Sequence, residues 1–327
     1  GGKERGWGIS VRVHECSGSE SCGGRPAGGF LLGELRQSLV DLLARVGRGG
    51  RVDIKQELKE RVLDVVLSGE WRRELGRALE LADRLLDEVA RGYRTAYNTV
   101  VDLRAYLETP GLVGMGSGLF KPIFEMGLSF DALLGLPFYP GSSIKGGIRS
   151  VAEEVIGESH ARALFGDSEE EGFAGLFSFA SAYPVGCFKE AIAPCLVLTG
   201  DVITPHYLVP ELGIVDAELD AGPTPVVHLA IAPGTVFRFI IGVREPLGRH
   251  REEVARAVEA AAAKKVLQEG SNPHSRTLGL LAARLALLAM SRGFAARSGK
   301  GYNTFSPLVD TGLTHKNVVS IAISSRR

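Results

Sequence analysis

Residues 136–149 carry the feature that most constrains how this chain can fold. They read Leu-Pro-Phe-Tyr-Pro-Gly-Ser-Ser-Ile-Lys-Gly-Gly-Ile-Arg. Pro140-Gly141 predicts a tight turn, and Ser142 or Ser143 is a suitable N-terminal cap for a helix that follows it. Since the free N–H groups of a first helical turn attract anions, the segment predicts a helix start that can face a phosphate.

Two cations and two glycines follow in the same predicted helix. Lys145 and Arg149 are one helical turn apart, so both would face the anion. Gly146 and Gly147 have no side chain, so a ligand or a second backbone could approach closely, although each costs the helix about 1 kcal/mol relative to alanine. The alternative is an ordinary capped helix with a surface lysine.

A second segment of similar chemistry, residues 293–305, follows a long apolar helical pattern. It is not a nucleotide-triphosphate loop, because that motif needs a preceding strand, a following helix and a Ser or Thr after the lysine. Here Lys300 is followed by Gly301. A helix C-cap at Gly293 followed by a strand is the plain interpretation, but it leaves the cluster of Arg297, Ser298 and Lys300 unexplained.

Together the two segments resemble the RAMP superfamily of CRISPR proteins, whose members carry a Pro-Gly-Ser-Ser-x-Lys-Gly-x-x-Arg element and a C-terminal glycine-rich loop. Further motifs occur in the order seen in the family of sixth Cmr subunits of type III-B effector complexes. These motifs are Gly114-Met115-Gly116, Glu125-Met126-Gly127-Leu128, Leu164-Phe165-Gly166 and the segments 201–207, 223–226 and 233–239. The resemblance covers roughly residues 110–306.

The resemblance implies which residues contact RNA, with Tyr302 or Phe294 stacking on a base. The implied RNA-binding set is Ser142, Ser143, Lys145, Gly146, Arg149, Arg297, Ser298, Gly299, Lys300, Gly301 and Tyr302. The family's loop tends to read Gly-x-Gly-Ala-Lys-Thr-x-x-Gly-Tyr-Gly, whereas this chain has Ala295, Arg297 and Asn303 at three of those places. Arg297 keeps the charge.

The order of predicted elements indicates an α+β chain in three parts. Residues 1–29 read as a flexible tail, residues 30–107 as a helical N-terminal region with leucines at helical spacing, and residues 108–327 as a ferredoxin-like, or RRM-like, RAMP domain with inserted hairpins. In that domain we expect an antiparallel sheet with both principal helices on one face. The expected helices are 143–157, 250–268 and 275–292, and the expected strands are 112–116, 175–182, 195–203, 226–231, 236–243, 301–307 and 318–323.

Charge and composition limit the classes of function. The chain has 38 basic and 38 acidic residues, so any contact with RNA must be local. No apolar run is long enough to span a membrane and no signal peptide is visible, so we expect a cytoplasmic protein. Scarce asparagine and glutamine fit a thermophile.

The four cysteines lack the spacing of a zinc site. Cys187 and Cys195 flank a possible hairpin and could face each other, but two separate buried thiols are the preferred interpretation. We expect no metal and no cofactor. The acidic run 167–171 could bind a metal in principle, yet it reads more simply as a solvated loop.

Three functions are consistent with this sequence. The first is a non-catalytic RNA-binding and assembly subunit of a type III-B Cmr complex; the resemblance implies that it holds guide RNA near its 3′ part, beside RAMP backbone subunits and target RNA. The second is a RAMP-type endoribonuclease using His160 or His206, although neither has an obvious titrating partner. The third makes the helical region a partner-docking module, and this does not exclude the first.

Overall fold

The computed structural model describes most of the chain beyond its first 26 residues. The described ranges are 27–48, 52–116, 118–166, 174–188, 196–204, 208–209, 213–214, 225–310, 318–319 and 321–325. Several predictions lie outside them. These concern the tail up to residue 26, Cys16, Cys22, Cys195, His206 and the acidic run 167–171.

The centre of the molecule is a ferredoxin-like β-α-β-β-α-β unit, as predicted. Its sheet has the order β11-β1-β10-β4, with β14 also paired to β1 and β5 paired to β10, and every pairing is antiparallel. The elements in chain order are β1 (Thr99–Leu107), α4 (Gly141–Ile156), β4 (Phe177–Phe179), β5 (Tyr183–Cys187), β10 (Thr235–Val243), α7 (Ser275–Arg292), β11 (Phe305–Pro307) and β14 (Ile321–Ser325).

The first strand is not where the sequence placed it. Helix α3 ends at Ala96, and residues 99–107 form the central strand β1, so the prediction that the helical region continues to residue 107 is wrong. The β-branched run Thr99-Val100-Val101 favours a strand. Residues 112–116, predicted as the first strand, contribute no strand, and the neighbouring Gly111 forms only an isolated bridge to Ile231.

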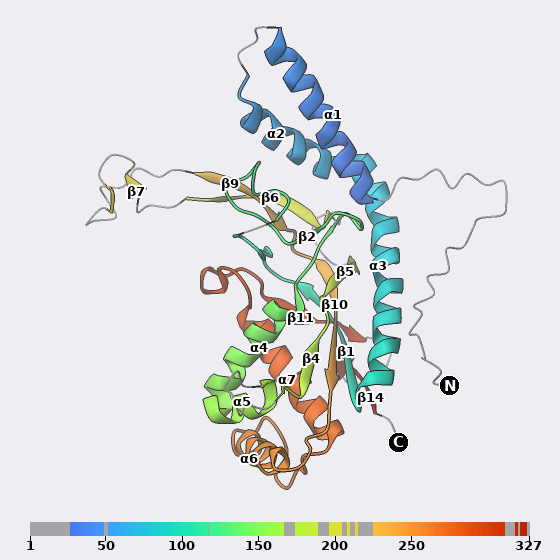
Figure 1. The fold of residues 1–327 in the computed structure, drawn as a ribbon, viewed down its shortest axis with the longest axis vertical. Coiled ribbons are helices and arrows are strands. Elements are labelled where there is room, and N and C mark those ends of the chain that lie inside the picture. Colours follow the sequence, from blue (N-terminus) through green and yellow to red (C-terminus); the bar gives the residue numbers. More distant parts are fainter. Residues whose placement is uncertain are drawn as a thin grey trace, which may run out of the picture.

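Helices cover both faces of the sheet (Figure 1). Helix α3 (Gly69–Ala96) lies along one face against β5, β10 and β1, whereas α4 and α7 pack on the other face. Helices α1 (Ala27–Gly47) and α2 (Ile54–Leu67) extend beyond one end of the sheet. This confirms a helical N-terminal region joined to an α+β domain.

The remaining elements lie around this unit. Helix α5 (Glu158–Phe165) packs between α4 and α6 (His250–Ala263). The sequence predicted that this last helix extends to residue 268, but it ends at Ala263. Within the described ranges, four two-stranded hairpins also occur. They are β2 (Phe130–Asp131) with β3 (Leu136–Pro137), β6 (Leu198–Ile203) with β9 (Val226–Ile231), β7 (Leu208–Val209) with β8 (Gly213–Ile214), and β12 (Val309–Asp310) with β13 (Val318–Val319).

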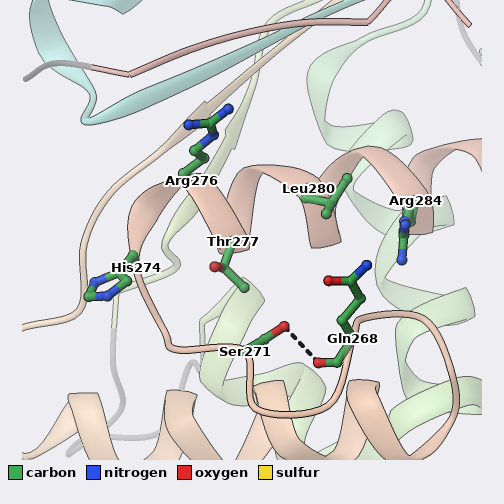
Figure 2. Close-up of a pocket in the computed structure, with 7 residues that line it drawn as sticks. All are labelled: Gln268, Ser271, His274, Arg276, Thr277, Leu280 and Arg284. Atoms are coloured by element: carbon green, nitrogen blue, oxygen red, sulfur yellow. Dashed lines mark hydrogen bonds between the residues drawn. The ribbon is translucent and has the colours of Figure 1, made fainter. Parts of the chain in front are cut away.

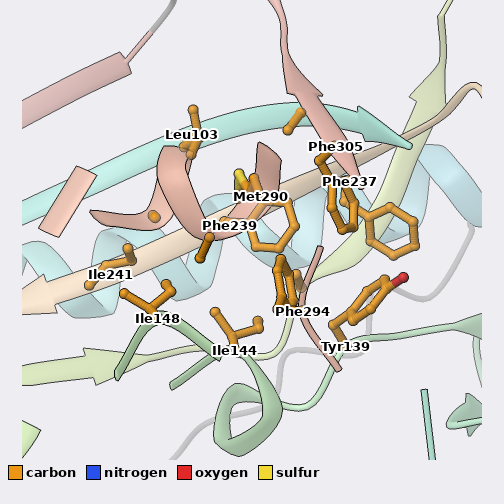
Figure 3. Packing of buried hydrophobic residues seen from close by; sticks show 14 of the residues in the cluster. Leu103, Tyr139, Ile144, Ile148, Phe237, Phe239, Ile241, Met290, Phe294 and Phe305 are labelled. Carbon is orange, nitrogen blue, oxygen red and sulfur yellow. The ribbon is translucent and has the colours of Figure 1, made fainter. Parts of the chain in front are cut away.

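A cluster of aromatic side chains forms the core beneath α4 and α7 (Figure 3). Tyr139, Phe237, Phe239, Phe294 and Phe305 are all buried. Phe294 stacks on Phe305 with ring centroids 5.3 Å apart, and Tyr139 meets both rings edge-on. Because Tyr139 precedes α4 and Phe294 follows α7, this core joins the two segments singled out in the sequence.

A buried arginine fixes α3 to the sheet. Arg238 on β10 is 5% exposed and donates to Asp102 on β1 at 2.7 and 2.9 Å, and to Asp83 and Asp87 on α3 at 2.8 Å each. The hydrogen bonds to Asp102 in particular raise the pKa of Arg238, and the hydrogen bond from Arg238 lowers the pKa of Asp87. Every nitrogen of this guanidinium is therefore used within the protein.

Two further observations concern the described part of the chain. Cys187, the last residue of β5, is disulfide-bonded, so the prediction of two separate buried thiols is wrong for this residue; Cys195 is not among the described residues. None of the described helices has the length and apolar character needed to cross a membrane.

Candidate RNA-binding surface

Helix α4 begins at Gly141, before either predicted cap. Its N-cap is Pro140, whose carbonyl accepts the N–H groups of Ser143 at 2.9 Å and Ile144 at 3.1 Å. The capping prediction for Ser142 and Ser143 is wrong, because the fixed φ of proline already sets the helix start. Within the described residues neither serine hydroxyl has a hydrogen-bond partner, and Ser142 is exposed. Both hydroxyls therefore stay available to a ligand.

The two glycines of α4 serve different purposes. A Cβ at Gly147 would lie 2.4 Å from the Cβ of Phe294, so only glycine lets α4 approach the second segment this closely. A Cβ at Gly146 would meet nothing within 4 Å, and Gly146 is exposed. Gly147 thus explains the contact between the segments, and Gly146 leaves open space beside Lys145.

Asn303 ties the two segments together. It is fully buried, and its Oδ1 accepts the Tyr139 hydroxyl and the Leu112 N–H, both at 2.7 Å. Its Nδ2 donates to the carbonyls of Ala296 at 2.6 Å and Leu112 at 3.1 Å. The sequence showed Asn303 only as a departure from the family's glycine. The available signal was that asparagine tolerates left-handed backbone better than other non-glycine residues.

The second segment is a tight loop with several left-handed residues. Gly293 caps α7, as predicted, and a single 3-10 turn spans Ser298–Lys300. The positive φ angles are 82° at Gly293, 72° at Ala295, 58° at Arg297, 84° at Gly301 and 62° at Asn303. Non-glycine residues in this region are strained and persist only where the surrounding structure holds them. The loop therefore has one defined shape, although it lacks two of the family's glycines.

The cations of the two segments differ in whether they are paired. Lys145, Arg297 and Lys300 have no ion pair or side-chain hydrogen bond within the described residues. Arg149, by contrast, donates to Glu153 at 2.8 Å and to the carbonyl of Gly166 at 3.3 Å. Its guanidinium therefore reaches along α4 toward α5, and its proposed contact with a phosphate stays a prediction.

Of the two candidate stacking residues, only Tyr302 is partly exposed. Phe294 is 3% exposed within the core, so the prediction that it could stack on a base is wrong. The Tyr302 hydroxyl donates to Asp201 on β6 at 2.6 Å, and burial together with this hydrogen bond raises the pKa of Tyr302 to about 12. This bond holds the loop against the β6–β9 hairpin.

A buried histidine lies beside that hydrogen bond. His228 pairs with Asp201 across the hairpin, and its ring centroid is 6.5 Å from that of Tyr302. Both ring nitrogens are buried, and neither has a hydrogen-bond partner within the described part of the chain. Burial lowers the pKa of His228, and Asp201 opposes this effect. Sequence reasoning missed His228, since a lone histidine in a strand gives no signal.

Of the two catalytic candidates, His160 has no hydrogen-bond partner within the described residues, and His206 lies outside them. His160 lies on α5, which is distant in sequence from residues 293–305. Among the described residues, no group of three or more His, Cys, Asp or Glu side chains could hold a metal ion. His250 is buried, and its Nε2 lies 2.6 Å from the carbonyl of Ala163.

Comparison with known proteins identifies the class. The model of the RAMP superfamily matches residues 104–301, more than half of the chain, and this range includes both segments up to Gly301. The chain therefore belongs to the RAMP superfamily.

Two similar proteins show which members of the superfamily this chain resembles. The CRISPR system CMR subunit Cmr6 of Saccharolobus solfataricus is 35% identical over 199 residues, which are 61% of this chain and 64% of that protein. The chain thus matches less than two thirds of that relative's length. A chain in the cryo-EM structure of the type III-B Cmr-beta complex bound to cognate target RNA has a TM-score of 0.53 and 29% identity, covering 83% of this chain and 73% of that one.

Proposed function

We propose that the protein is a non-catalytic RNA-binding and assembly subunit of a type III-B CRISPR effector complex, holding guide RNA near its 3′ part. The relatives support the complex, since one is a Cmr6 subunit and another comes from a Cmr complex bound to target RNA. The observation that carries the RNA-binding role is the junction at Gly147, Phe294 and Asn303. It brings into contact the two segments that bear the unpaired cations.

Phosphate contacts explain why these residue types suit the role. Lys145, Arg297 and Lys300 neutralise phosphates, while the hydroxyls of Ser142, Ser143 and Ser298 reach phosphate oxygens or 2′-hydroxyls. The exposed glycines Gly146, Gly299 and Gly301 let the backbone of the strand come close. Such contacts hold RNA without reading its sequence, which a guide-binding subunit requires.

The N-terminal helices support the assembly role. Helix α1 exposes Leu39, Val40, Leu43 and Val46, each between 40% and 52%. Apolar side chains clustered on one protruding helix mark an interaction surface. We assign this surface to the binding of neighbouring RAMP backbone subunits. The chain then consists of two parts, the helical region that carries this surface and the RAMP domain. The role places the protein in the cytoplasm.

A matched pair of glycine variants tests the RNA contact. Gly146 on α4 and Gly76 on α3 are both exposed and helical, and a Cβ at either would meet nothing within 4 Å. Gly146→Leu and Gly76→Leu should therefore each leave the melting temperature unchanged or higher. In the assembled complex, guide RNA occupancy should fall only for Gly146→Leu. Equal occupancy in the two variants would reject the assignment of α4 to RNA.

The non-catalytic assignment has its own test. The purified protein should leave single-stranded RNA intact in magnesium, in manganese and in EDTA. Cleavage that disappears in His160→Ala or His206→Ala would establish the endoribonuclease instead.

A further inference from the structure

A surface hollow lies between the start of α7 and the loop that follows α6 (Figure 2). It measures about 630 Å³. Thr277 and Arg284 on α7 lie across from Gln268 and Ser271 of the preceding loop, with His274 and Arg276 near the start of the helix. Leu280 is the one aliphatic residue of its lining.

The hollow is positively charged on a chain without net charge. Its lining includes Arg276, Arg284 and His274, and none of the described residues that line it is a carboxylate. Between residues 264 and 284 the sequence has four basic residues (Lys264, Lys265, Arg276 and Arg284) against one acidic residue, Glu269. Arg284 donates to the carbonyl of Val266, whereas Arg276 is exposed and has no ion pair within the described residues. A local excess of this kind attracts an anion.

The uncharged lining residues indicate which anion. Gln268, Ser271 and Thr277 supply hydroxyl and amide groups beside the cations, and the Ser271 hydroxyl already donates to the Gln268 carbonyl. Arginine, serine, threonine and glutamine are the side chains that bind nucleic-acid phosphates. A protein partner would need aromatic or aliphatic anchors, and the lining offers only Leu280. An acidic protein surface is therefore the weaker candidate.

The hollow is separate from the surface described above. That surface includes the loop after the C-terminus of α7, whereas the hollow lies along the first part of the same helix, as far as Arg284. Arg284, the lining residue nearest to that loop, precedes Gly293 by nine residues, so the two are about 14 Å apart along the helix. We propose that the hollow is a second, sequence-independent site for the phosphate backbone of an RNA strand. This goes beyond the proposed function, which uses only the other end of the helix.

The test compares two charge reversals on the purified full chain. Arg276→Glu alters the hollow, while Arg256→Glu on α6 is the control, because Arg256 is exposed, unpaired within the described residues and absent from the lining. Both variants change the net charge equally. Each is made in the wild-type chain and in a Lys145→Ala, Arg297→Ala, Lys300→Ala background. The probe is fluorescent polyuridine RNA of about 30 nucleotides at roughly 0.1 M salt, where phosphate contacts dominate.

We expect Arg276→Glu to weaken RNA binding by about fivefold in both backgrounds, and Arg256→Glu by less than about twofold. Melting temperatures, measured alongside, should be unchanged. Equal effects of the two reversals would overturn the second site. The triple-substituted background separates the two proposals: if its three substitutions have no effect while Arg276→Glu still does, the proposed function fails and the second site stands.

Discussion

The two faces of the sheet use the same type of side chain, a basic one, for opposite purposes. Beneath α3, Arg238 is buried and bonded to Asp83, Asp87 and Asp102. In the loop that follows α7, Arg297 and Lys300 have no ion pair within the described residues. A charge with all its partners inside the protein stabilises the fold, while unpaired cations on a tightly held loop suit an external anion.

The two cations of α4 also differ in whether they are paired. Lys145 is unpaired like the loop cations, whereas Arg149 is held by Glu153 and Gly166. Spacing along the helix placed the two together, yet their hydrogen bonds assign them to different regions. Pairing in the structure is thus a better guide to function than the position of a basic residue in a motif.

The largest expected effect lies on the α3 face. Arg238→Ala should lower the free energy of unfolding by about 3–5 kcal/mol, because it leaves three carboxylates without their buried partner. Urea denaturation measures this. Arg104→Ala is the control. Arg104 is 45% exposed and, among the described residues, forms an ion pair only with Asp83, so its loss should cost less than about 1 kcal/mol. Similar losses in both variants would contradict the buried network.

The junction residue Asn303 should come next. Asn303→Ala leaves the buried Tyr139 hydroxyl and Leu112 N–H and the half-buried Ala296 carbonyl without this partner. It also puts alanine at a φ of 62°, so we expect a loss of about 2–4 kcal/mol in the free energy of unfolding. Asn303→Gly relieves the backbone strain but still loses the hydrogen bonds, so its loss of stability should be smaller than that of Asn303→Ala. If Asn303→Gly were as stable as the wild type in urea, the hydrogen bonds would not matter.

His228 should make the loop side sensitive to acid. Because burial lowers its pKa in the folded state, the unfolded chain binds the proton first as the pH falls below about 6.5. Stability should therefore decrease as the pH falls through this range, and His228→Phe should reduce that decrease. Urea denaturation at pH 7.5 and 5.5 gives the comparison. An identical pH dependence in the two proteins would rule out His228 as the cause.

The smallest expected effect is an increase in stability. Ala295 has a φ of 72°, a conformation that glycine adopts without strain, so Ala295→Gly should raise the free energy of unfolding by up to about 1 kcal/mol. The melting temperature should rise accordingly. A lower melting temperature would mean that the methyl group packs usefully despite the strain.

The sequence predicted the ferredoxin-like order and the helices near 143–157 and 275–292, because turns, glycines and apolar periodicity are local signals. It misplaced the first strand, since residues 99–107 follow a long helix without a glycine or proline to separate them. The candidate site was predicted as two segments. Their junction at Asn303 and the pairing of Arg149 depend on contacts between distant parts of the chain, which no local pattern reveals.

The central claim is that the unpaired cations bind the RNA backbone. Its most direct test is the salt dependence of RNA affinity for Lys145→Ala, Arg297→Ala, Lys300→Ala against Arg77→Ala, Arg84→Ala, Arg91→Ala, which removes three ion-paired arginines from the exposed side of α3. Both variants lose three charges. We predict that the slope of log affinity against log salt falls by about 2 in the first, at roughly 0.7 per contact, and stays unchanged in the second. Equal slopes in the two variants would contradict the account.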